Sequence, residues 1–151
     1  MTEENQQAET NQASAIISEE DWLKKEHGEV LAYCSRNFLE ISEIIQTESA
    51  VLPPFVAVWL AKSKTNNQKF WIITGDVPHD HIPGGNAKNA RDAIRHFSLR
   101  WQLKAENIVK GQPNSQSKPV LSETQKEFAE LLVSRANSLY MLSEKEELWL
   151  N

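Results

Sequence analysis

Two apolar runs in the middle of the chain constrain the fold more than any other feature. Residues 55–61 read FVAVWLA and residues 70–74 read FWIIT, both rich in β-branched and aromatic side chains that favour strands. Residues 64–68 between them, KTNNQ, are typical of a turn. The pattern predicts an antiparallel β-hairpin. Because the first run has no polar alternation, its strand is expected to be covered on both faces.

A two-stranded hairpin is marginally stable by itself, so other segments must cover it. Helical spacing of apolar residues predicts a helix from Glu19 to about Ser35, a second that begins at Asn86 or Asn89 and stops at Gly111, and a third over 122–142. We therefore predict an α+β fold in which a short antiparallel β-hairpin or sheet packs against an N-terminal helix and two long C-terminal helices. A third strand is expected from residues 48–52 or from a second subunit.

The remaining segments are assigned from composition and from capping signals. Residues 1–17 are polar and are predicted to be a disordered tail, which leaves 18–151 as a single α+β domain. Residues 112–119 resemble a linker, and residues 38–45 fit either a short helix or a strand, of which we favour the helix. Two capping boxes are expected, at residues 122–125 and at 143–146, and the second would open a final turn that carries Trp149.

Net charge, apolar run length and cysteine content argue against some classes of function. The net charge is −5 and the isoelectric point is about 5.4, and this acidic balance argues against a nucleic-acid partner. No apolar run is long enough to cross a bilayer, and the first residues lack the pattern of a secretory signal. The one cysteine, Cys34, fits a small core residue in a reducing compartment. We expect a cytoplasmic protein that does not bind membranes.

The chain resembles a small uncharacterised bacterial family that is known only as a domain of unknown function. The resemblance rests on LPP at 52–54 leading into VAVW at 56–59, on ITGDVP at 73–78 with DHI at 80–82, and on ARDAIRHF at 90–97 with LRW at 99–101. It covers roughly residues 20–145. It implies no established activity, so it assigns no role to any residue.

Polar chemistry is densest between residues 70 and 101. Asp76, His79, Asp80 and His81 follow the second predicted strand, and imidazoles spaced as H-x-H are possible ligands of transition metals. A second spaced pair is absent, so we predict no metal site, with His79 and His81 as the candidates if one exists. The alternative is a polar loop whose aspartates bond their own backbone.

The start of the next predicted helix offers two further hypotheses. Gly84, Gly85 and Asn86 precede Arg91 and Arg95, and backbone amides beside two guanidinium groups could hold an anion. Alternatively, the glycines only form a turn and the arginines pair on the surface with acidic residues, for which the candidates are Asp92, Glu40 and Glu43.

His96 lies further along the same predicted helix. It could act as an acid or base beside Asp76 or Asp80, or it could simply pack beside Phe97.

We rank first a non-enzymatic binding or protein-interaction domain, whose partner is an unknown protein or a second copy of the chain. The reasons are an apolar hairpin with too few strands, exposed aromatic residues near the end such as Trp149, and the lack of a complete catalytic set. The alternative is a small-ligand, anion or metal site, with hydrolysis as one activity it could support, formed by the 75–83 loop and the 86–101 helix. No cofactor is predicted.

Overall fold

The computed structural model describes residues 18–111 and 120–150. The predicted tail and the predicted linker both lie outside these residues, and the extent of the single domain stays a prediction. The helices are α2 (Glu19–Arg36), α3 (Ala90–Lys110) and α4 (Glu123–Glu144), and the strands are β1 (Ile41–Ile44), β2 (Ala50–Leu52), β3 (Val56–Ser63), β4 (Lys69–Gly75) and β5 (Asp80–Pro83). Short 3₁₀ turns cover Gln46–Glu48, Gly84–Asn86 and Glu146–Leu148.

The five strands form one antiparallel sheet around the predicted hairpin of β3 and β4. β4 pairs with β3 on one side and with β5 on the other, while β1 and β2 pair one after the other with the far edge of β3. The third strand expected from residues 48–52 is therefore present as β2. Since β1 and β2 come from the same chain, no second subunit is needed to pair β3.

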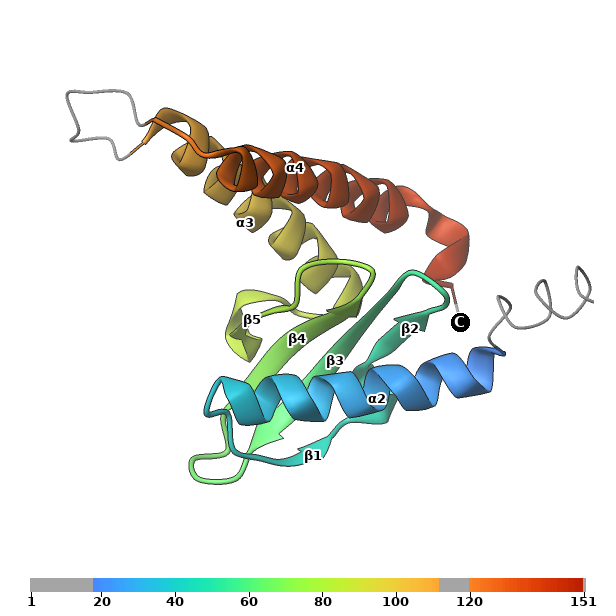
Figure 1. Cartoon of the computed structure of the whole chain (residues 1–151). Coiled ribbons are helices and arrows are strands. Elements are labelled where there is room, and N and C mark those ends of the chain that lie inside the picture. Colours follow the sequence, from blue (N-terminus) through green and yellow to red (C-terminus); the bar gives the residue numbers. More distant parts are fainter. Residues whose placement is uncertain (1–17, 112–119, 151) are drawn as a thin grey trace, which may run out of the picture.

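Helices cover both faces of the sheet, as the unbroken apolar run predicted. Side chains alternate along β3: Val56 and Val58 pack with α3 and α4, whereas Ala57 and Trp59 pack with α2. Figure 1 shows α2 crossing one face while α3 and α4 lie side by side on the other. The predicted α+β fold, with an N-terminal helix and two long C-terminal helices around an antiparallel sheet, is confirmed.

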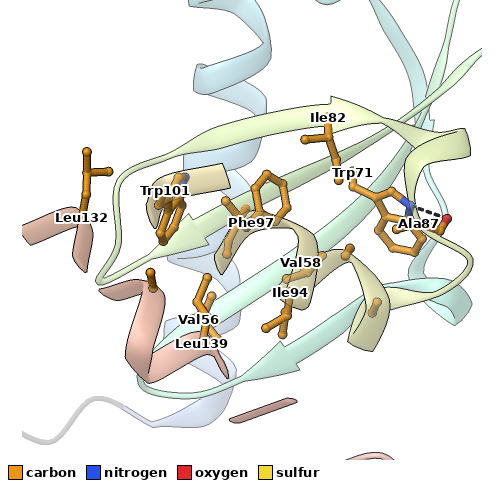
Figure 2. Packing of buried hydrophobic residues seen from close by; sticks show 14 of the residues in the cluster. Val56, Val58, Trp71, Ile82, Ala87, Ile94, Phe97, Trp101, Leu132 and Leu139 are labelled. Carbon is orange, nitrogen blue, oxygen red and sulfur yellow. Dashed lines mark hydrogen bonds between the residues drawn. The ribbon is translucent and has the colours of Figure 1, made fainter. Parts of the chain in front are cut away.

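The larger core lies between the sheet and α3. Phe97 and Trp101 lie on successive turns of α3, and their rings pack at a tilt of 41° with centroids 6.1 Å apart. The indole N–H of the buried Trp71 donates to the carbonyl of Ala87, which fixes the segment that leads into α3 (Figure 2). Burying such large rings supplies much of the driving force for folding, and their N–H groups need partners inside the core.

Side-chain caps are present at the starts of the three long helices. Ser18 accepts from the amide of Asp21 at the start of α2, and Asn89, rather than Asn86, accepts from Asp92 at the start of α3. The capping box of α4 forms in full between Ser122 and Gln125. These caps satisfy amides that would otherwise lack partners.

The helix favoured for residues 38–45 is wrong, because residues 41–44 form strand β1. Phe38 adopts a φ of 58° just after α2, and the amide of Leu39 returns to the carbonyl of Cys34, so the chain turns there. Pairing of β1 with β3 satisfies the edge of a buried strand, which a helix could not do. Tertiary pairing thus overrides a local pattern that fits both structures.

The second capping box, at residues 143–146, is also wrong. Ser143 lies inside α4 and its hydroxyl donates to the carbonyl of Tyr140. The side chain of Trp149 is not exposed as predicted. It is half-buried against the larger core, and its indole N–H donates to the carbonyl of Leu142. The end of the described chain is therefore folded back onto α4.

The lack of a side chain at Gly75 allows the end of β4 to lie against Phe55, in the turn before β3. This close approach gives a stability test. Its φ is +118°, and an added Cβ would lie 2.8 Å from the Cα of Val56 and closer still to the carbonyl oxygen of Phe55. Gly75→Ala should lower the free energy of unfolding by about 2 kcal/mol or more, because strain and a backbone clash add together. Urea denaturation monitored by circular dichroism measures the change.

Gly28→Ala is the matched control. Gly28 lies in the middle of α2, and a Cβ there would meet nothing within 4 Å. This substitution should raise the free energy of unfolding by about 0.5–1 kcal/mol, since alanine favours the helix. Equal effects of the two substitutions would contradict the role given to Gly75.

Candidate functional site

The polar segment between residues 75 and 83 is a strand in its second half, and this determines where its side chains go. Residues 80–83 form β5 and pair with β4, so the prediction of a continuous loop is wrong for that part. Neighbouring side chains of a strand lie on opposite faces. His81 therefore faces α2, and Asp80 faces α3.

His81 forms a hydrogen-bonded pair with Tyr33 of α2. The Tyr33 hydroxyl lies 2.7 Å from His81 Nδ1, and the two ring centroids are 5.6 Å apart. Burial, helped by the negative charge of Asp80, raises the pKa of Tyr33 to about 12. The phenol therefore keeps its proton near pH 7. It donates to Nδ1 when neutral His81 carries its proton on Nε2, and it accepts from Nδ1 in the other tautomer.

Burial also lowers the pKa of His81 below its ordinary value. The carboxylate of Asp80 opposes this shift, and the guanidinium of Arg100 adds to it. The neutral imidazole is thus the form that the folded protein favours near pH 7. This pair can tie α2 to the edge of the sheet without any charge.

His79 also lies near Tyr33, with ring centroids 6.4 Å apart. Both candidate metal ligands thus border the same tyrosine. However, among the residues that the structure describes, no group of three or more His, Cys, Asp or Glu side chains is placed to hold a metal ion. The described part of the chain therefore offers no ligand set for a metal at His79 and His81.

Asp80 binds α3 through one carboxylate oxygen and the backbone of its own strand through the other. Oδ2 accepts from Arg100 Nε at 2.9 Å and from Trp101 Nε1 at 3.0 Å, while Oδ1 accepts from the amide of His81 at 2.8 Å. The last bond agrees with the alternative in which the aspartate satisfies local backbone. Consecutive residues of β5 thus hold the helical layers on the two faces of the sheet.

The other candidates lie elsewhere. Asp76 is exposed and contacts α4, where Arg135 approaches its carboxylate at 3.6 Å and donates to its carbonyl oxygen at 2.7 Å. His96 is half-buried on α3, and the described residues provide no hydrogen bond to it. Asp76, His81 and His96 therefore do not meet in one acid–base arrangement.

Arg91 and Arg95 lie on one side of α3, as expected from their spacing, but they face the end of α4. Both donate to the carbonyl of Ser143, and they pair with Glu146 and Glu144, respectively. The partners proposed from the sequence, Asp92, Glu40 and Glu43, are wrong because the fold of the last segment was not anticipated. The Arg91 pair raises the pKa of the guanidinium and lowers that of the Glu146 carboxyl.

A polar cleft of about 570 Å³ opens at the start of α3. Lys88, Asn89 and Arg91 line it together with Trp71 and Trp149. This is where the anion hypothesis would place its ligand. An anion bound to Arg91 would have to compete with Glu146, whose oxygens lie 2.7 and 3.2 Å from the guanidinium nitrogens.

Glu26 is a buried polar group that the sequence did not reveal. It lies on the face of α2 that packs against the sheet, and the described residues provide no hydrogen-bond partner for its Oε1. It lines neither the cleft at the start of α3 nor the neighbouring groove beside Trp59. No ligand can be assigned to it on this basis.

The largest concave feature that we describe lies between α3 and α4, outside the polar segment. We call it the hairpin groove; its volume is about 890 Å³. Its apolar residues are Ala105 and Val109 of α3, Ala129 and Val133 of α4, and Leu121 just before α4. Sequence analysis placed the residues of α3 and α4 on helices but missed the groove. The available signal was that Val109 and Val133 fall beside the buried stripe of each helix instead of within it.

Asp80 gives a test of the contact between β5 and α3. Asp80→Ala leaves the indole N–H of the almost fully buried Trp101 without its acceptor, and should lower the free energy of unfolding by about 1–3 kcal/mol. Arg100→Ala is the matched control, since it removes only the half-exposed partner and should cost under about 1 kcal/mol. Chemical denaturation distinguishes the two, and a larger loss for Arg100→Ala would refute the assignment.

His81 gives a test by pH. The unfolded chain binds a proton at the ordinary histidine pKa of 6.5, whereas the folded chain binds it only at lower pH. Acidification therefore favours unfolding: this contribution to stability is complete above about pH 6.5 and is lost as the pH falls towards the lowered pKa. Urea denaturation between about pH 8 and pH 5 should show a smaller pH dependence in His81→Gln than in the parent. Identical dependence would show that His81 contributes nothing.

Comparison with known proteins adds the family but no activity. No curated protein and no solved structure matches the chain. Within the described residues, no helix is both long and apolar enough to cross a membrane. A family of unknown function, which the sequence resemblance predicted, does match residues 17–149 and so covers most of the chain. The chain therefore belongs to the family described as Domain of unknown function (DUF4826).

Proposed function

We propose that this protein is a non-enzymatic, cytoplasmic protein-interaction domain that binds its partner along the hairpin groove. The observation that carries the proposal is an apolar groove between two helices at the place where both leave the sheet. Val109 is 55% exposed and Val133 is 43% exposed, although both lie on helices whose neighbouring turns are packed. Contiguous exposed apolar surface bounded by charged residues is typical of a protein-binding site.

The arrangement of the helices supports this surface. The last fully buried residue of α3 is Ala105, and the first of α4 is Ala129. Figure 1 shows the ends of the two helices extending past the sheet, so that only the two helices contact each other there. A pair of antiparallel helices buries one stripe of each helix and leaves the sides of the pair open for further helices.

The polar residues give less support to a catalytic or ligand-binding function. His81 and Asp80 are bonded to Tyr33, Arg100 and Trp101, and these contacts hold the layers of the fold together. Arg91 is paired with Glu146. The buried, unpaired Cys34 agrees with a reducing compartment, which supports the proposed location.

Site-specific cross-linking tests the proposal. A photoreactive benzophenone side chain in place of Val133 should yield covalent adducts in the native cells, because a bound partner would cover this position. The same group in place of Lys64, in the exposed turn between β3 and β4, is the control and should yield none. The adducts from position 133 should also disappear when Val109→Glu places a charge in the groove. Equal labelling from both positions would refute the proposed surface.

A further inference from the structure

We propose that the occupant of the hairpin groove is a second copy of this chain, which packs by two-fold symmetry to form a four-helix arrangement. This inference rests on the proposed function and specifies the partner. Its basis is the order of the four charged residues that flank the apolar floor of the groove. They are Glu106 and Lys110 on α3, and Lys126 and Glu130 on α4.

The four charges lie at two levels along the hairpin. α3 runs towards the free end of the hairpin and reaches Glu106 before Lys110, whereas α4 runs back from that end and reaches Lys126 before Glu130. Both lysines are therefore nearer the free end, and both glutamates lie one turn further in. At about 1.5 Å rise per residue, the two levels are about 6 Å apart.

This order is self-complementary under a two-fold axis. The axis lies in the interface, at right angles to the length of the hairpin and midway between the two levels. It places the lysine level of one copy against the glutamate level of the other. At each end of the interface, the lysines of one copy then face the glutamates of the other, because a two-fold interface contains every contact twice. A partner shifted by one turn would instead meet like charges, so the same residues would also fix the register.

The apolar floor fits the same axis. Val109 lies between Glu106 and Lys110 along α3, and Ala129 lies between Lys126 and Glu130 along α4. Both would therefore pack near the axis, against their own counterparts. Ala105 and Ala129 are small, which allows the helices of the two copies to approach closely, and the volume of about 890 Å³ leaves room for the valine side chains of the facing copy.

The ion pairs within one chain do not prevent ion pairing between two copies. Lys110 bonds Glu106 at 2.6 Å, and Lys126 lies 3.6 Å from Glu123. All four side chains are more than half exposed, and such pairs contribute little to stability. The groove on the other side of the hairpin lacks the charge order. Its polar residues, Asn107, Thr124 and Gln125, are uncharged, and the ring of Phe128 is covered by Lys104. The charge pattern thus selects one side of the hairpin.

Charge reversal in the full-length protein tests the inference by sedimentation equilibrium. The parent should change from monomer to dimer as its concentration rises. The variant Lys110→Glu/Lys126→Glu places acidic groups against acidic groups, so its dissociation constant should rise by at least about tenfold. Glu106→Lys/Glu130→Lys should behave alike. An equimolar mixture of the two variants should recover the dimer, because opposite charges again face each other.

A variant with all four charges reversed is the control for loss of folding. Combining all four reversals keeps opposite charges four residues apart on each helix. The α3 pair is therefore retained in reversed order, while α4 loses only the exposed pair between Lys126 and Glu123. This variant should dimerise with itself and should not form mixed dimers with the parent. Circular dichroism of each variant confirms its helix content before sedimentation is compared.

The possible outcomes separate the two proposals. A parent protein that is monomeric at every accessible concentration overturns self-association, as do reversals that leave the dissociation constant unchanged. If a monomeric parent still gives an adduct of a different protein from position 133, the interaction domain stands and only the identity of the partner is wrong. If position 133 gives no adduct, both proposals fall.

Discussion

Everything in this structure depends on covering strand β3 completely. Its residues 56–61 are buried on both faces, so every backbone group along it must find a partner within the sheet. β4 supplies one edge, and β1 and β2 together supply the other. The side chains alternate between two separate apolar clusters, and this alternation requires a helical layer on each face. The rest of the chain provides these layers.

Strand β5 uses the same alternation with polar side chains. It is a short edge strand whose consecutive residues Asp80 and His81 bind α3 and α2, respectively. A polar cluster of this kind resembles a catalytic site in sequence because it requires the same residue types. In space the carboxylate and the imidazole side chain lie on opposite faces, and each is bonded to a different helix. Their contacts give the helical layers fixed positions, which apolar packing alone does less well.

The parts of the fold that sequence could predict are those determined by local patterns. The apolar runs predicted the central hairpin, the capping box at residues 122–125 predicted the start of α4, and helical spacing predicted the three long helices. The failures have one cause, which is pairing between distant segments. Residues 41–44 form a strand because one edge of β3 requires a pairing partner. Arg91 pairs with Glu146 because the last described residues fold back onto α4.

The candidate site was less predictable, because a linear cluster does not specify which face each residue takes. Alternation along residues 80–82 would have separated Asp80 from His81 if this segment had been assigned as a strand. The hairpin groove was harder to foresee, since it exists only because α3 and α4 continue for several residues past the sheet. Solubility alone would favour polar residues at Val109 and Val133, whose side chains are about half exposed. Apolar side chains in that position, inside a symmetric frame of two lysines and two glutamates, are what an interface between identical copies requires.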